Sequence, residues 1–134
     1  MNAYLAIKYH PDCSNRALIE QLTIALETCH INTFCVARDI EKWGKFQFAP
    51  QELMVKSFAW LQSSDLMIME CSEKGVGLGI EAGYAYANNI PIIGIARTGS
   101  DISTTLQGIS QDVIFYDRPA DLIPEFIKRF PSIS

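Results

Sequence analysis

The sequence predicts an α/β domain built on a parallel β-sheet, and three observations lead to that prediction. The chain has 134 residues, which is about the length of one ordinary domain. Short apolar runs alternate five times with segments that have helical spacing. The third and fourth apolar runs lack the alternation of a sheet with one face in water, so we expect helices to cover both faces of those strands.

The expected strands are short runs of apolar, β-branched or aromatic residues that end at polar or turn-forming residues. They lie at residues 3–9, 31–37, 66–70, 91–96 and 113–116. The expected helices have apolar residues three and four positions apart, with Ser14 or Asn15 capping the first and Pro50 in the first turn of the second. They lie at residues 18–29, 50–63, 80–88, 102–108 and 121–130. The polar segment 38–50 is expected to be a loop.

These elements predict one domain over residues 1–134 with a doubly wound, three-layer α/β/α architecture. The expected strand order is 2-1-3-4-5, which is the flavodoxin-like arrangement. Ligands of such sheets bind outside the carboxyl ends of the strands where the order reverses, here between the first and third strands. We therefore expect the loops at 8–12 and 71–81 to frame a site, with the loop at 38–43 opening on the same edge.

The composition excludes several classes of protein. Hydrophobic residues make up 49% of the chain and charged residues 19%, which argues against disorder and a coiled coil. Eleven Lys and Arg against 15 Asp and Glu give a net charge of −4, so a nucleic-acid polymer is not an expected partner. A small phosphate ester is not excluded, because a few local cations suffice to bind it.

The cellular setting is predicted from the same composition. No apolar run approaches the roughly 18 residues that a membrane span needs, and the N-terminus has no signal-peptide pattern. The four cysteines form no Cys-x-x-Cys pair and are expected to be free thiols in a reducing compartment. The sequence thus predicts a cytoplasmic protein without a metal site.

Three glycines, Gly75, Gly77 and Gly79, alternate ahead of the helix expected at 80–88. Glycines at that place let the backbone turn and let its N–H groups point at an anion. A dinucleotide fingerprint would instead follow the first strand, so a nicotinamide cofactor is not expected. The alternative is that the glycines only close a tight turn, with Gly79 and Gly83 allowing close helix–sheet packing.

Glu81 is expected in the first turn of that helix, beside the crevice. A carboxylate fixed there can attack a sugar carbon as its base leaves, through a covalent glycosyl-enzyme intermediate. The structural alternative is a carboxylate that stabilises the positive end of the helix.

A compound motif surrounds these residues. It consists of Trp60-Leu61-x-x-x-Asp65, the apolar strand 66–70, and Gly77-x-Gly79-x-Glu81-x-Gly83-x-Ala85. Together with the opening Tyr4-Leu5-Ala6, the motif resembles the nucleoside 2-deoxyribosyltransferase-like family, which includes the 2′-deoxynucleoside 5′-phosphate N-glycosidases. The resemblance covers most of residues 1–96. It implies a flavodoxin-like fold, a homodimer, Glu81 as the nucleophile and Tyr4 as a tyrosine that orients it.

The chain departs from the family pattern at two places. Ser57 stands three residues before the tryptophan, where the family usually has an aspartate. The alternative to a role in the site is that Ser57 is simply a residue of the helix surface. The first strand of the family usually ends in glycine and a small or hydroxyl residue, whereas this chain has Ile7-Lys8-Tyr9-His10. Asp39, after the second strand, could supply a replacement carboxylic acid, and its alternative role is a turn or cap residue.

The remaining candidates are substrate-binding residues. Lys8 and His10 could bind a phosphate or carboxylate together with the amides of the glycine loop. The alternative interpretation is that Lys8 is only solvated and that His10 is an ordinary loop residue. Trp43 could stack on a planar base, although tryptophan also caps the edge of a core.

Two functions follow from these observations. The first is an enzyme that cleaves or exchanges the N-glycosidic bond of a small-molecule nucleoside or nucleotide through Glu81. The second is a catalytically degenerate relative that only binds a nucleotide-like ligand, as a sensor or regulatory protein. The complete motif at 77–85 favours the enzyme, whereas Ser57 favours the binding protein.

Overall fold

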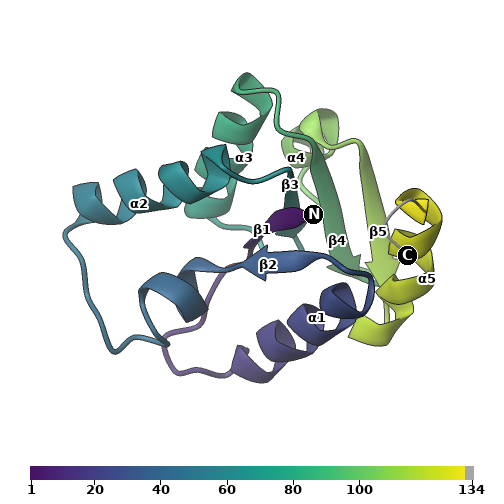
Figure 1. Ribbon diagram of the computed structural model, residues 1–134, viewed down its shortest axis with the longest axis horizontal. Coiled ribbons are helices and arrows are strands. Elements are labelled where there is room, and N and C mark those ends of the chain that lie inside the picture. Colours follow the sequence, from purple (N-terminus) through teal and green to yellow (C-terminus); the bar gives the residue numbers. More distant parts are fainter. Residues whose placement is uncertain (132–134) are drawn as a thin grey trace.

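The computed structural model describes residues 1–131, which form a five-stranded, fully parallel sheet with the order β2-β1-β3-β4-β5 (Figure 1). The predicted flavodoxin-like topology is confirmed. The strands are β1 (Asn2–Ala6), β2 (Asn32–Phe34), β3 (Leu66–Glu70), β4 (Ile92–Arg97) and β5 (Asp112–Tyr116).

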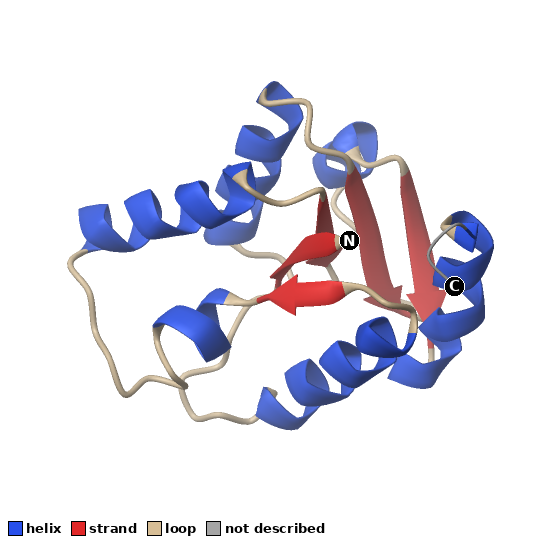
Figure 2. Cartoon of the chain, viewed as in Figure 1, coloured by secondary structure: helices blue, strands red, loops and turns tan. Residues whose placement is uncertain are grey.

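Helices cover both faces of the sheet, as the apolar third and fourth strands predicted (Figure 2). One face packs against α1 (Arg16–Thr28) and α5 (Leu122–Arg129). The other face packs against α2 (Pro50–Gln62), α3 (Val76–Ala87) and α4 (Thr104–Ile109). The structure thus has three layers. None of the helices within residues 1–131 is long and apolar enough to cross a membrane.

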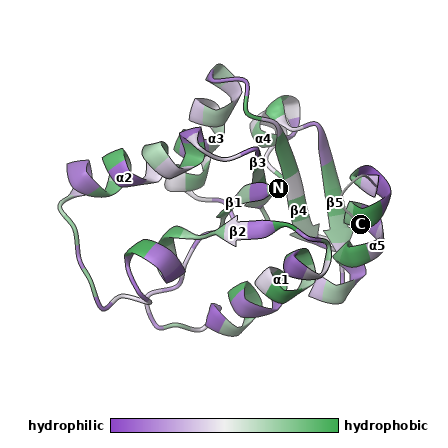
Figure 3. Ribbon diagram, in the orientation of Figure 1, coloured by the Kyte–Doolittle hydropathy of each residue, from purple (hydrophilic) through white to green (hydrophobic). Residues whose placement is uncertain are grey.

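The buried hydrophobic residues divide between two cores, one on each face of the sheet. Strand β4, which contributes to both cores, is coloured mostly as hydrophobic in Figure 3. Alternation along β1 sends Ala3 and Leu5 to the α1/α5 face and Tyr4 and Ala6 to the α2/α3 face. All five residues of β3 are buried, including the charged residue that ends it, Glu70. The four cysteines are free thiols, as predicted.

The first two strands are shorter than predicted. β1 ends at Ala6 because the chain then leaves the sheet, and the side chain of Asn15 holds the new loop by accepting from the His10 N–H and donating to the Lys8 carbonyl. β2 ends at Phe34 and is followed by a π-helical turn, η1 (Val36–Ile40), where a strand end and a loop were expected. The Asp39 carboxylate fixes this turn by accepting a 2.9 Å hydrogen bond from the Cys35 N–H.

Helix α3 begins at Val76, four residues before its predicted start. Gly77 and Gly79 therefore lie inside the helix and not in a turn ahead of it, and Gly75 alone occupies the extended N-cap position. Glycine disfavours a helix interior. The helix forms here because Leu78, Ala82 and Ala85 bury one stripe against the sheet, and such packing outweighs local propensity.

Candidate active site

The predicted nucleophile, Glu81, lies in the second turn of α3 and not in its first turn. The residue is partly exposed, but its Oε2 atom is buried. The charge at the start of a helix falls off within one turn, so stabilisation of the helix end does not account for this carboxyl group. The predicted capping alternative for Glu81 is therefore wrong.

The partner of Glu81 is Tyr4, which comes from the central strand β1 and is fully buried. The two groups face each other closely enough to shift each other's pKa, yet neither Tyr4 Oη nor Glu81 Oε2 makes a hydrogen bond of ordinary geometry in the described part of the chain. Buried polar atoms are rarely left in this state. The pair is therefore poised to accept a further polar group.

Burial controls the electrostatics of this pair. Loss of water around the carboxylate raises the pKa of Glu81 to about 7, although the Tyr4 hydroxyl favours the ionised form and limits the rise. Burial, followed by the negative charge of Glu81, raises the pKa of Tyr4 above its ordinary value. Tyr4 thus stays a hydrogen-bond donor at neutral pH, while Glu81 exchanges its proton there.

Ser57 lies next to this pair. Its side chain is 3% exposed, so the prediction of a helix-surface residue is wrong. The hydroxyl donates a 2.8 Å hydrogen bond to the Leu53 carbonyl within α2, and it also acts on the pKa of Tyr4. The residue that replaces the family aspartate is therefore part of the Tyr4–Glu81 cluster.

Glycines leave the helix surface open around Glu81. A Cβ atom added at Gly77, Gly79 or Gly83 would meet nothing within 4 Å. Close helix–sheet packing at Gly79 and Gly83 was the predicted alternative, and it is wrong. Gly77 lies one turn before Glu81 on the same side of α3, where a side chain would stand beside the carboxylate.

Two other residues of the motif hold the frame together. The Asp65 carboxylate accepts a 2.9 Å hydrogen bond from the Asn2 N–H and so fastens the start of β3 to β1. The Trp60 ring stacks on Phe34 at 3.9 Å between centroids, and Phe34 in turn lies 5.7 Å from the ring of Tyr4. These contacts position Tyr4.

The loops after β1 and β3 lie side by side, as predicted. The side chain of Lys8 passes over Gly75, with Cδ 3.7 Å from the place of a Cβ atom there. His10 Nε2 pairs with the Glu73 carboxylate at 2.7 Å, and its Nδ1 bonds to Ser14 Oγ at 2.8 Å. Lys8, His10 and Gly75 thus converge at the edge where the strand order reverses.

Asp39 and Trp43 lie in other surroundings. Burial acts to raise the pKa of Asp39, but the Arg38 guanidinium and the Cys35 N–H outweigh it and lower this pKa. Asp39 is thus an ionised residue that fixes a turn, which was its predicted alternative role. Trp43 packs at the edge of the core between Tyr9 and Arg16, whose guanidinium carbon lies 4.5 Å from the centroid of the indole ring. A catalytic Asp39 and a base-stacking Trp43 stay predictions, and the contacts of both residues favour a structural role.

Comparisons with known proteins agree with the fold and with the resemblance that the motif at 60–85 indicates. No family model matches the chain. The chain is 38% identical over 42 residues to a proposed 2′-deoxynucleoside 5′-phosphate N-hydrolase from Syntrophotalea carbinolica, and this match spans 31% of the chain and 30% of that protein.

Three solved structures share the fold over most of the chain. A conserved protein from Enterococcus faecalis has a TM-score of 0.72 at 17% identity, covering 96% of this chain and 98% of that one. A 2-deoxyribosyltransferase from Bacillus psychrosaccharolyticus has a TM-score of 0.67 at 13% identity, with 92% and 90% covered. The CMP N-glycosidase BcmB from Clostridium botulinum has a TM-score of 0.65 at 18% identity, with 93% and 97% covered.

The fold and the Tyr4–Glu81 pair define a flavodoxin-like α/β protein with a desolvated carboxyl group near the reversal of strand order. Within that class, the comparisons support the resemblance to the nucleoside 2-deoxyribosyltransferase-like family that the motif at 60–85 indicates.

The raised pKa of Glu81 predicts a pH dependence of stability. The pKa rises from 4.5 to about 7 on folding, so the folded state binds more protons than the unfolded state between these values. The free energy of unfolding should then fall as the pH rises through this window, by on the order of 3 kcal/mol. Glu81→Gln should remove this decline and be the more stable protein above pH 7. Urea denaturation across the window measures it, with the exposed Glu125→Gln as control, and parallel curves for wild type and Glu81→Gln would contradict the prediction.

Proposed function

We propose that this protein cleaves or exchanges the N-glycosidic bond of a nucleoside or nucleotide, with Glu81 as the nucleophile. The observation that carries the proposal is the desolvated Glu81 carboxyl group, which faces the Tyr4 hydroxyl beside an open, glycine-lined helix surface. Perturbed carboxyl groups of this kind are typical of catalytic sites. The relatives named as an N-hydrolase, a deoxyribosyltransferase and an N-glycosidase support the same class of reaction.

The reaction proceeds in two displacements. The ionised Glu81 attacks the anomeric carbon of the sugar, the bond from that carbon to the base nitrogen breaks, and its electron pair leaves with the base. The result is a sugar ester of Glu81. Attack on the same carbon by water, which loses a proton, or by a second base releases the sugar and restores the carboxylate. Tyr4 orients the carboxylate throughout, because its own raised pKa keeps its proton in place.

Replacement of the nucleophile gives the first test. Glu81→Gln keeps the shape of the side chain and removes its charge, so release of free base should fall about 1000-fold, which is about 4 kcal/mol in the barrier. Chromatography after incubation with a panel of nucleosides and nucleotides measures free base, and mass spectrometry detects the sugar ester on wild-type Glu81. Glu125→Gln, on the exposed face of α5, is the matched control. Turnover by Glu81→Gln at the wild-type rate would refute the nucleophile.

The Tyr4 hydroxyl sets the pH range of the reaction. Only the ionised Glu81 can attack, so activity should rise with pH through about 7. Tyr4→Phe removes the hydroxyl that favours the ionised form, and the rise should shift to higher pH. The shift is measured in initial rates, with Thr28→Val, which removes an exposed hydroxyl from α1, as control. An unshifted profile would show that Tyr4 does not act on Glu81.

We also propose a homodimer formed through α2 and α3. Five large apolar side chains are 49–82% exposed on these two helices: Val55, Trp60, Val76, Ile80 and Tyr86. Exposed apolar clusters of this kind mark interaction surfaces. Light scattering at micromolar concentration should report twice 15.0 kDa, and Val55→Asp should shift the mass toward the monomer. Ile24→Asp, at an equally exposed position on α1, should leave the mass unchanged. A monomeric wild type would contradict this proposal.

Binding without catalysis is the second candidate function. It is favoured by Ser57, whose hydroxyl is committed to the Leu53 carbonyl at the position of the family aspartate. The same panel distinguishes the two functions, because a binding protein would shift its melting temperature with a nucleotide and release no free base. A cytoplasmic location stays a prediction.

A further inference from the structure

A cavity opens at the carboxyl edge of the sheet, on the α1/α5 face and away from the Tyr4–Glu81 pair. Its volume is about 750 Å³, which is within the range of small-molecule sites. It is framed by the loop after β1, the start of α1 and the ends of β3, β4 and β5. Tyr4, Ser57 and Glu81 are not among its lining residues, because Tyr4 points to the opposite face of the sheet.

The deepest charged group of this cavity is Glu70, which is only 4% exposed. Its Oε1 atom accepts a 2.6 Å hydrogen bond from the Ser72 N–H, and its Oε2 atom accepts one from the Tyr116 hydroxyl. A carboxylate has about four lone-pair sites, so acceptor capacity remains for a ligand. Glu70 is thus a fixed acceptor for hydroxyl groups that enter the cavity.

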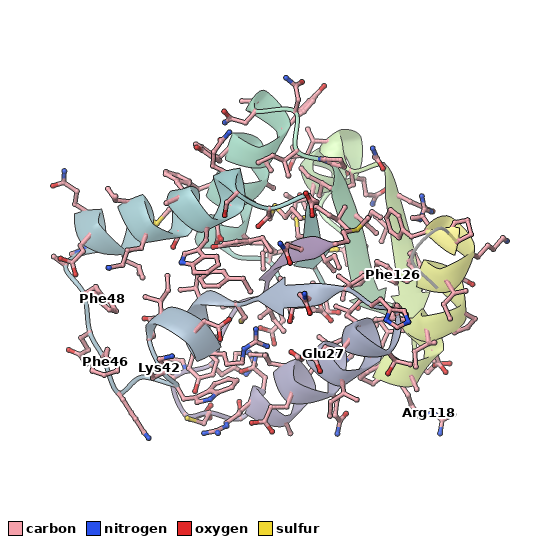
Figure 4. The ribbon with its side chains drawn as sticks, viewed as in Figure 1. Glu27, Lys42, Phe46, Phe48, Arg118 and Phe126 are labelled. Carbon is pink, nitrogen blue, oxygen red and sulfur yellow. The ribbon has the colours of Figure 1, made fainter. Side chains whose placement is uncertain are left out.

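Three cations line the same cavity: Lys8, Arg97 and Arg118. Among residues 1–131, none of them takes part in an ion pair. Arg97 is fixed at its backbone, where its N–H donates to Ser72 Oγ at 2.8 Å, and Arg118 projects from the segment between β5 and α5 (Figure 4). The acids of the lining are Glu70, Asp117 and Glu73, and the last is already paired with His10. The cavity thus has as many acids as cations, but Glu70 and Glu73 are already engaged by Tyr116, Ser72 and His10, whereas the three cations are in no ion pair with the described acids.

The start of α1 adds to this preference for an anion. Ala17 and Leu18, in the first turn of this 13-residue helix, line the cavity. No side chain caps the helix and no acidic residue lies in its first turn, because the amide of Asn15 is committed to the loop after β1. Free N–H groups at the start of a helix attract negative charge. Ala17 and Leu18 line the same cavity as the three cations.

We propose that this cavity is a second binding site, for a small phosphorylated polyol such as a sugar phosphate. The phosphate group lies toward Lys8, Arg97, Arg118 and the start of α1, and the hydroxyl groups lie toward Glu70. Neither Trp nor Phe occurs among the described lining residues, and Tyr116 is only 2% exposed, so the cavity offers little of the stacking surface that the base of a nucleotide would use. The site does not depend on the chemistry proposed for Glu81.

Titration calorimetry on the full chain tests the proposal with three probes: ribose 5-phosphate, inorganic phosphate and ribose. Ribose 5-phosphate should bind most tightly, because it alone engages both the cations and Glu70. Arg97→Gln and Arg118→Gln should each weaken its binding by about tenfold or more. Glu70→Gln should weaken ribose 5-phosphate and leave inorganic phosphate unchanged. Lys128→Gln removes a positive charge outside the cavity, and Glu81→Gln alters the other site, so both should bind like the wild type.

Several outcomes would overturn the proposal. Among them are no heat of binding from any probe at millimolar concentration, and unchanged affinity in both arginine variants. Loss of binding in Glu81→Gln would place the ligand at the other site. Equal affinity for inorganic phosphate and ribose 5-phosphate would overturn the polyol assignment. Arg118 is exposed, so its variant keeps the test decisive even if the buried Glu70→Gln does not fold.

Discussion

Strand β1 is the element on which the rest of the structure depends, because it pairs on both sides and its side chains alternate between the two faces. Tyr4 lies opposite Phe34 of β2 and Met67 of β3. The reversal of strand order occurs beside β1, so its carboxyl end opens onto the crevice that α/β sheets use for ligands. Leu5 completes one hydrophobic core, and Tyr4 carries its hydroxyl into the other.

The candidate active site is a consequence of this burial. A carboxyl group in water would be fully ionised at neutral pH. Burial removes much of the water around Glu81 and raises its pKa to about 7, so this group is only partly ionised there. The same loss of water lowers the stability of the folded protein when Glu81 is ionised, and it makes the ionised carboxylate more reactive. Functional sites commonly combine lower stability with higher activity in this way. The nearby glycines add no side chains over Glu81, so the surface of α3 around this carboxyl group stays open.

The two faces of the sheet divide the chemistry between them. The α2/α3 face holds a carboxyl–phenol pair with exposed apolar residues around it, and the α1/α5 face holds a cavity with a buried acceptor and three cations. Lys8 touches both regions, because it lines the cavity and crosses Gly75 at the start of α3. The contact between His10 and Glu73 connects the loop after β1 to the loop after β3, and so joins the two regions at one edge of the sheet.

The order of strands and helices was determined by the sequence alone, because apolar periodicity and strand length record which faces must leave water. Residues 66–70 were predicted to the residue, since an apolar run buried on both faces has sharp ends. Tyr4 and Glu81 were predicted by family resemblance, and the sequence could not show that they meet. Tertiary packing alone decided the start of α3, the burial of Ser57, the π-helical turn and the commitment of Asp39 to Arg38. Glu70 carried a signal, an acidic residue at the end of an apolar strand, but its partner Tyr116 lies 46 positions away. The pKa of Glu81 and the shape of the cavity beside Glu70 both depend on which side chains exclude water. Contacts between residues far apart in the chain decide this, so the sequence alone does not show it.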